Sequence, residues 1–131
     1  MNSLFDNTVQ LLTKAISFTN LRHNVIASNI ANVDTPGYKA MDLKFEHLFK
    51  KAFKRGSATA LSTAGRSLPE WKNSQPMLVL DTTQYSRLDG NTVNPDQQLA
   101  QLAENTIMYN SLVQLLNTKF KMLQTAISER R

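Results

Sequence analysis

Two long stretches at opposite ends of the chain, neither interrupted by glycine or proline, constrain the fold more than any other feature. In the N-terminal stretch, the side chains of one row recur at alternating steps of four and three residues. These steps average 3.5 residues, the period of a helix that packs along another helix in a coiled coil. The pattern predicts one helix from Leu4 to Asn32, about 43 Å long. The row comprises Phe5, Val9, Leu12, Ile16, Thr19, His23, Ile26, Ile30 and Val33.

The C-terminal stretch has the same period and a well-marked beginning. Asn94 can act as the N-cap, and Pro95 suits the first helical position. The pattern predicts a second helix that extends from residue 94 toward residue 131, about 50 Å long. Its row comprises Leu99, Leu102, Thr106, Tyr109, Val113, Leu116, Phe120, Leu123 and Ile127.

Each predicted helix carries a further apolar row beside the first. Two helices that pack only on each other form a closed hairpin, which does not easily cover two rows on each helix. Neighbouring chains can cover the remainder, so the pattern leaves both a closed hairpin and a larger assembly open. The additional rows are Leu4, Leu11, Ala15, Phe18 and Val25 in the first helix, and Met108, Leu112, Leu115, Met122 and Ala126 in the second.

The residues between the two helices are of a different kind. The sequence Thr35-Pro36-Gly37-Tyr38 has proline and glycine at the positions where a type II turn needs them. Residues 42–55 place several apolar side chains on one face and are predicted to form a short helix. Residues 77–80 are predicted to form a short strand, and residues 89–91 a tight turn.

These elements predict a mainly α fold, in which the long N- and C-terminal helices pack as a coiled-coil-like pair. The irregular middle segment holds a short helix and little β structure. In terms of domains, we expect a terminal-helix core domain formed by residues 1–39 plus 94–131. The middle segment then spans residues 40–93.

The sequence contains no pattern of catalytic or metal-binding residues. There is no cysteine, which excludes disulfides, thiolate metal sites and a cysteine nucleophile. The two histidines, His23 and His47, have no second ligand at metal spacing, and His23 falls on the apolar row, where we expect a core or interface residue. Phosphate-binding loops and hydrolase motifs are also missing. We therefore expect a protein that is not an enzyme and binds no cofactor.

Most of the net charge of +5 lies in and around the predicted short helix. Lysine and arginine side chains there surround three phenylalanines. One interpretation is a helix packed through its phenylalanines, with solvated cations on the opposite face. The others are contacts with an acidic protein, a membrane surface or, least favoured by the pattern, nucleic acid. The cations are Lys44, Lys50, Lys51, Lys54 and Arg55.

The sequence predicts neither a membrane span nor a cleaved leader. No run approaches the roughly 18 apolar residues that a transmembrane helix requires. No basic side chain precedes Lys14, so the charged region that opens a secretory signal is missing. We expect a chain that carries no cleaved signal peptide.

The sequence at the end of the first predicted helix resembles a signature of bacterial flagellar axial proteins. This signature occurs near the N-terminus of rod and hook proteins, and it is present here as Ala-Asn-x-x-Thr-Pro-Gly-Tyr over residues 31–38. The sequence Leu88-Asp89-Gly90-Asn91-Thr92-Val93 and the segments at residues 102–105 and 112–116 are similar to the proximal-rod proteins of the flagellar basal body. The resemblance covers both ends of the chain and little of its centre.

The resemblance implies a structural subunit of the proximal rod, placed in the periplasmic part of the flagellar basal body. Proteins of this family are exported unfolded through the type III apparatus without a cleaved signal peptide. They assemble through their terminal helices into a helical driveshaft that transmits torque. The implied partners are further copies of the chain, rod subunits of the FlgC type, a rod adaptor of the FliE type, the export gate and the ring around the rod. A membrane-proximal contact is also implied, and nucleic acid is not.

The resemblance also assigns roles to two sets of residues. The helix contacts of assembly are expected at Leu12, Ile16, Ile26, Leu102, Leu116 and Leu123. The bend after the first helix is expected at Asn29, Asn32, Thr35, Pro36, Gly37 and Tyr38. The alternative is a soluble helical adaptor that binds an acidic protein or a membrane surface through the basic helix at residues 42–55.

Overall fold

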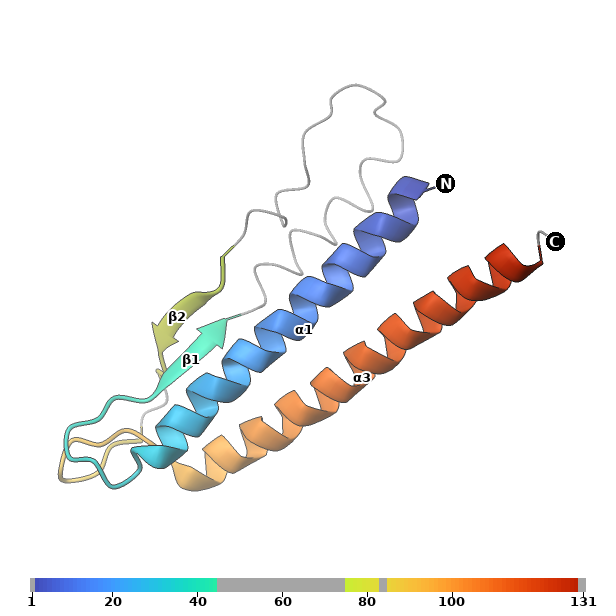
Figure 1. The fold of residues 1–131 in the computed structure, drawn as a ribbon. Helices are drawn as coiled ribbons and strands as arrows, with labels where there is room; N and C mark the ends of the chain where they lie inside the picture. Colours follow the sequence, from blue (N-terminus) through green and yellow to red (C-terminus); the bar gives the residue numbers. More distant parts are fainter. Residues whose placement is uncertain (1, 45–74, 83–84, 130–131) are drawn as a thin grey trace.

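The computed structural model describes residues 2–44, 75–82 and 85–129. The elements follow in the order α1 (Asn2–Ala31), β1 (Met41–Lys44), β2 (Met77–Leu80) and α3 (Pro95–Ser128). Figure 1 shows α1 and α3 running antiparallel beside each other, so that both chain termini lie at the same end. The predicted fold class, mainly α with a pair of long helices and little β structure, is confirmed.

The two predicted helices form close to their expected bounds. At the beginning of α3, the Asn94 side chain accepts a hydrogen bond from the backbone N–H of Gln97 at 3.4 Å, and Pro95 occupies the first turn. The predicted N-cap is therefore confirmed, and it satisfies one of the free N–H groups of the first turn. α1 ends at Ala31, before the proline-glycine turn that cannot continue it.

The packed face of α3 lies one residue away from the predicted apolar row. The buried residues of α3 are Gln98, Asn105 and Leu112, at steps of seven. The predicted row was wrong at five positions, because Leu99, Thr106, Tyr109, Phe120 and Ile127 are exposed. His23 of α1 is also exposed in the single chain, so it is not a core residue; its expected place in an interface stays a prediction. The reason for the offset in α3 is that two of its three buried side chains are amides, which a pattern of apolar residues does not detect.

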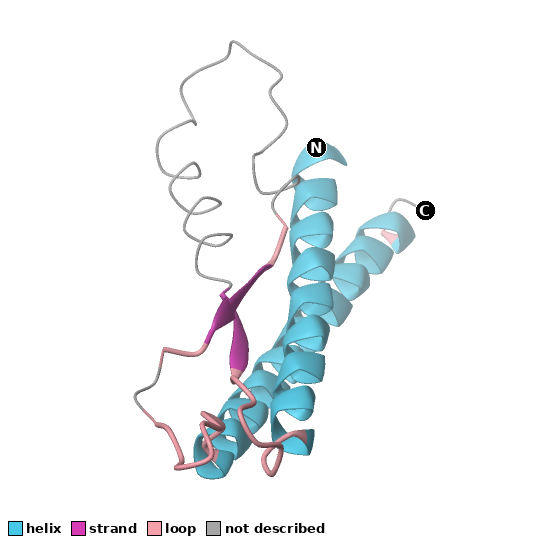
Figure 2. Cartoon of the chain, turned by 90° about the vertical axis from the view of Figure 1, so that its left-hand side faces the viewer, coloured by secondary structure: helices cyan, strands magenta, loops and turns pink. Residues whose placement is uncertain are grey.

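The two strands form a small antiparallel sheet beside α1 (Figure 2). Its register pairs Met41 with Leu80 and Lys44 with Met77. The sheet is attached to α1 through a contact between the buried side chains of Leu43 and Phe18, against which Val25 also packs. The strand predicted at residues 77–80 is confirmed.

The predicted helix at residues 42–55 is wrong at its beginning. Residues 42–44 belong to β1, because their backbone pairs with β2 and Leu43 turns toward Phe18. A helical start at Asp42 would break both contacts. The rest of this predicted helix, including its basic cluster beyond Lys44, lies outside the described residues.

Burial is concentrated at the end of the helical pair where the sheet and turns lie. The last buried residue of α3 is Leu112, although the helix continues to Ser128. Beyond it, four large apolar side chains of α3 are at least half exposed. Figure 1 shows the two helices diverging in the same direction, toward the chain termini. These side chains are Leu115, Phe120, Met122 and Ile127.

Candidate functional site

The turn that follows α1 has the predicted type II arrangement. The N–H of Tyr38 donates to the carbonyl of Thr35 at 3.3 Å, with Pro36 and Gly37 between them. Gly37 has a backbone φ of +74°, a conformation that residues with a Cβ rarely adopt. Its N–H donates to the carbonyl of Asp89 at 3.0 Å, so this turn is joined directly to a second one.

The second turn precedes α3 and confirms the tight turn predicted at residues 89–91. The N–H of Gly90 donates to the carbonyl of Arg87 at 3.0 Å, and Gly90 has φ +80°. Further bonds join the two segments, from the N–H of Thr92 to the carbonyl of Tyr38 at 3.0 Å and from the N–H of Ala40 to the Thr92 hydroxyl at 2.8 Å. The two turns therefore form one unit, which we call the turn junction (residues 32–41 and 87–93).

Replacing Gly90 by alanine is expected to destabilise the protein by about 1 kcal/mol, the cost of a positive φ for a residue with a Cβ. The added Cβ would lie 3.6 Å from the Cα of Gly37, an ordinary contact, so steric overlap adds little. Urea denaturation followed by circular dichroism measures the change. Ala103→Gly, at an exposed position inside α3, is a control that tests glycine in the opposite setting and should cost a similar amount. An unchanged midpoint in Gly90→Ala would contradict the assigned backbone conformation.

Asn91 holds the end of α1 in the turn junction. Its side-chain amide donates to the carbonyls of Asn32, Val33 and Thr35 at 3.0, 2.9 and 2.8 Å. Its side-chain oxygen accepts from the N–H of Val93 at 2.8 Å, and the residue is fully buried. Asn91 therefore binds the carbonyl groups of the turn that follows α1 and holds that turn against the segment before α3.

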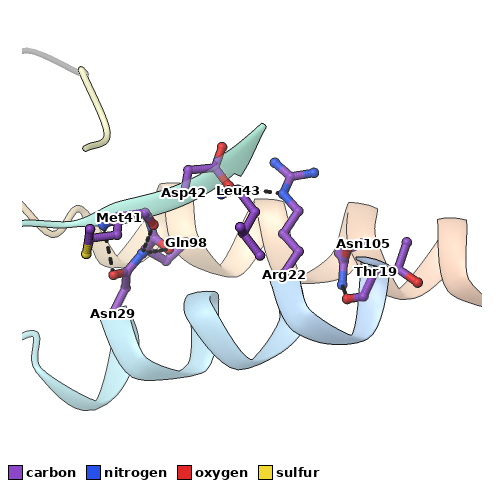
Figure 3. A network of polar contacts seen from close by, with 8 residues as sticks. All are labelled: Thr19, Arg22, Asn29, Met41, Asp42, Leu43, Gln98 and Asn105. Atoms are coloured by element: carbon purple, nitrogen blue, oxygen red, sulfur yellow. Dashed lines mark hydrogen bonds and ion pairs between the residues drawn. The ribbon is translucent and has the colours of Figure 1, made fainter. Parts of the chain in front are cut away.

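Asn29 connects α1, β1 and α3 (Figure 3). Its amide nitrogen donates to the carbonyl of Met41 at 2.7 Å and to the side-chain oxygen of Gln98 at 3.0 Å. Its side-chain oxygen accepts from the N–H of Met41 at 3.1 Å and from the Tyr38 hydroxyl at 3.4 Å. Since Asn29 is 0% exposed, its polar atoms depend on these partners in place of water.

Three cationic side chains form contacts in the turn junction or beside it. Arg22 forms a partly buried ion pair with Asp42 at 3.1 Å, which ties α1 to β1. Arg87 donates to the carbonyl of Val33 at 2.9 Å, and Lys39 donates to the carbonyl of Gly90 at 2.9 Å. Positive charge next to carbonyls at the C-terminal end of a helix is favourable, because the helix dipole is negative there.

A separate polar contact joins the two helices farther from the turns. The side-chain amide of Asn105 donates to the backbone carbonyl of Thr19 at 2.8 Å (Figure 3). The side-chain oxygen of Asn105 is buried and has no hydrogen-bond partner among the described residues. A single buried amide in a helical interface fixes the register of the helices at some cost in stability.

The residues predicted for the turn motif and those predicted for assembly lie in different surroundings. The six residues of the turn motif, Asn29, Asn32, Thr35, Pro36, Gly37 and Tyr38, lie together at the end of α1. The six residues expected in assembly are spread along both helices, where Ile26 is 0% exposed within the single chain. The other five, Leu12, Ile16, Leu102, Leu116 and Leu123, are half-buried. Their role in assembly remains a prediction.

Sequence reasoning missed the amides that join the helices and turns. Asn91 was assigned only to a turn, and the buried positions of Gln98 and Asn105 were not predicted. The available signal was their spacing, because Gln98, Asn105 and Leu112 recur every seven residues, the repeat of a helical interface. A search that admits buried amides into such a row would find them.

The described residues offer little chemistry beyond these contacts. Among them, no group of three or more histidine, cysteine or carboxylate residues could hold a metal ion. No helix in the same part of the chain combines the length and the apolar character that crossing a membrane requires. The polar groups of the turn junction bond to one another, which is the arrangement of a structural joint rather than of a reactive site.

Comparison with known proteins decides the family. Residues 13–39, which include most of α1 and the turn after it, match the family described as "Flagella basal body rod protein". The chain is 33% identical to the flagellar basal body rod protein FlgB of Bacillus subtilis, across 96% of this chain and 97% of that protein. The chain belongs to the FlgB family of flagellar basal body rod proteins.

Other FlgB proteins match over nearly the same length. Identity is 32% with FlgB of Escherichia coli, across 93% of this chain and 94% of that protein. It is 28% with FlgB of Borreliella burgdorferi, across 94% of this chain and 97% of that protein. As a FlgB-family protein, the chain is a structural subunit of the proximal flagellar rod and not an enzyme. Its place is accordingly the basal body rod.

Proposed function

We propose that α1 and α3 pack against neighbouring subunits and thereby build a helical rod that transmits torque. The observation that carries this proposal is the apolar surface that α3 leaves uncovered beyond Leu112. Leu115 is 54% exposed and Ile127 is 73% exposed. A concentration of exposed large apolar side chains of this kind marks a site of protein–protein contact.

The arrangement of these side chains favours contacts on two sides. Met108, Leu115 and Met122 follow one flank of α3 at steps of seven, whereas Phe120 and Ile127 lie on the other flank. The buried row of Gln98, Asn105 and Leu112 lies between the flanks. Different surfaces on the two sides favour head-to-tail contacts, which continue into a helical assembly instead of closing.

The turn junction and the buried amides beside it give such an assembly a rigid end. Asn29, Asn91 and Gln98 are buried and hydrogen-bonded across α1, the turns and α3. A load applied to one helix is therefore passed to the other through directional bonds as well as through apolar contacts. This property suits a subunit of a driveshaft.

On the same proposal, the chain is exported unfolded through the type III apparatus, without a cleaved signal peptide, and reaches a periplasmic position. Its neighbours are FlgC-type rod subunits, a FliE-type adaptor, the export gate and the surrounding ring, with a membrane-proximal contact at the base. Unfolding for export is helped by the modest core, since most of α3 beyond Leu112 buries little surface in the single chain. The alternative of a soluble adaptor depends on a basic helix that lies mostly outside the described residues.

Mass spectrometry of detergent-extracted basal bodies tests this function directly. The chain should be present in a few fixed copies, and its absence from otherwise complete basal bodies would reject the proposal in favour of the adaptor.

Leu115→Asp should remove the chain from these basal bodies and abolish motility, because it places a charge on the exposed apolar flank. Circular dichroism of the purified variant should remain that of the unmodified chain, because Leu115 is half exposed. Thr125→Asp adds the same charge at another exposed position of α3 and should be incorporated at more than half the normal level. Equal incorporation of the two variants would show that this flank makes no contact.

A further inference from the structure

The outer edge of the two-stranded sheet has no role in the contacts described so far. Figure 1 shows β2 on the side of β1 that faces away from α1. Three large apolar side chains of β2 are exposed, namely Met77 (60%), Leu78 (48%) and Leu80 (58%). A strand of this composition at the edge of a sheet is a template for pairing with another strand.

The hydrogen bonds of the sheet show which backbone groups of β2 point outward. The N–H of Asp81 donates to the carbonyl of Ala40 at 2.9 Å, one position before the first pair of the register. In an antiparallel ladder only every second pair exchanges such bonds, so Leu78 and Leu80 direct their N–H and carbonyl groups away from β1. No hydrogen bond within the described part of the chain engages these four groups.

The opposite edge of the sheet is occupied by side chains. The amide of Asn29 bonds to both the N–H and the carbonyl of Met41, as a neighbouring strand would. The N–H of Leu43 donates to the side chain of Asp42 at 2.8 Å. The edge that remains open to a further strand is therefore that of β2.

This open edge is complementary to itself. Two copies of β2 can pair antiparallel with Val79 opposite Val79 of the second copy, which places Leu78 of each copy opposite Leu80 of the other. These two leucines then exchange both backbone bonds, so the four outward groups of each copy are all satisfied. Apolar side chains also lie opposite apolar side chains, which stabilises a strand pair.

The ends of β2 favour this register over its neighbours. A slip of two residues in one direction places the carbonyl of Leu80 opposite Pro76, which has no N–H to donate. A slip of two residues in the other direction pairs Leu80 with itself and moves the contact beyond the end of β2. Only the register centred on Val79 pairs all the outward groups within the strand.

Charge favours the same register. Lys44 pairs with Met77 in the sheet, and Met77 lies opposite Asp81 of the second copy in the register centred on Val79. Lys44 and Asp81 of the second copy therefore stand in one row across three strands, with their Cα atoms about 10 Å apart. The twofold axis repeats this row of opposite charges, and no like charges lie directly opposite each other across the new pair.

We propose that the free chain forms a twofold dimer in which the β2 strands of two copies pair antiparallel, with Val79 at the axis. The two sheets become one sheet of four strands, whose outer edges are those already occupied by side chains. A twofold contact closes on itself and cannot extend. The dimer therefore goes beyond the proposed rod function: before assembly, it covers a strand edge that would otherwise pair with other strands.

Single-cysteine variants of the purified chain test this pairing, since the chain has no cysteine of its own. Val79→Cys should give a disulfide-linked dimer on mild oxidation, because the two opposed Cα atoms lie about 4.5 Å apart. Met77→Cys is the matched control and should give at least about tenfold less dimer, because its two copies are offset by about 13 Å along the strands. Equal cross-linking of the two variants, or stronger cross-linking of Leu80→Cys, overturns the proposed register.

Charge at the axis provides a second measurement. Val79→Lys or Val79→Glu places like charges opposite each other, so each variant alone should lower the dimer fraction in sedimentation velocity at least about fivefold. A mixture of the two should recover the dimer, because opposite charges then face each other, and a folding defect would not be repaired by mixing. Asn117→Lys, at an exposed position of α3, adds the same charge elsewhere and should change the dimer fraction less than about twofold.

The outcomes separate this inference from the proposed function. An unmodified chain that stays monomeric up to about 0.1 mM, or a mixture that does not recover the dimer, overturns the inference. Neither result alters the expected presence of the chain in basal bodies, which tests the rod function independently.

Discussion

Replacing Asn91 by aspartate is expected to lower the free energy of unfolding by about 3–5 kcal/mol. In the native chain, the Asn91 amide donates to three backbone carbonyls in the turn that follows α1. Aspartate has nearly the same shape, but it would direct carboxylate oxygens toward those carbonyl oxygens. The bonds become repulsions, and a fully buried site gains a charge. Urea denaturation monitored by far-ultraviolet circular dichroism measures the loss.

Asn117→Asp is the matched control, because it makes the same chemical change at an exposed position of α3. Its free energy of unfolding should remain within about 0.5 kcal/mol of the unmodified chain. Lower pH gives a second check. Burial raises the pKa of the new carboxyl at position 91, so the defect should shrink as pH falls below its unfolded value of about 4 and grow as pH rises through its folded value. Equal stability of the two variants at neutral pH would contradict the role assigned to Asn91.

Ile26→Asp is expected to abolish the folded helical pair, with a loss of more than about 4 kcal/mol. Ile26 is 0% exposed, so the carboxylate of the new aspartate would be buried without a partner. Thermal denaturation of the purified variant should show no cooperative unfolding transition. Ile107→Asp, at a position of α3 that is 67% exposed, should keep its transition within a few degrees. A cooperative transition in Ile26→Asp at the normal temperature would be incompatible with this burial.

The burial of Ile26 also changes how assembly experiments are interpreted. A rod defect in Ile26→Asp would reflect failure of the subunit to fold, and not the loss of a contact with a neighbour. Leu116 is half-buried, so Leu116→Asp mixes the same two effects. Leu115, the adjacent and more exposed residue, separates them.

The helices and turns could be predicted because their signals are local. Periodicity within one stretch determined where α1 and α3 form, and proline and glycine determined the turn at residues 35–38. The strand at residues 77–80 was predicted from its apolar run alone. The partner strand β1 was missed, because pairing Met41 with Leu80 is a long-range contact with no trace in the nearby sequence.

The polar junction could be predicted only in part. The importance of the turn motif was predicted, and Asn29 is its most heavily bonded member. The role of Asn91 was beyond sequence reasoning, since its three carbonyl partners lie 56–59 residues earlier in the chain. The packed row of α3 was misplaced for a related reason: amides such as Gln98 count as surface residues until their buried partners are known.

Because Lys44 pairs with Met77, the number of residues between them can change without changing the geometry of the helices. The middle segment begins after Lys44 and ends before Met77. Because these two residues are paired in the sheet, the distance between the ends of the segment is fixed. Doubling the length of chain between these points costs only about 0.6 kcal/mol in loop-closure entropy. A chain built on this plan can therefore be longer or shorter between Lys44 and Met77 without a change in how its two terminal helices pack on each other.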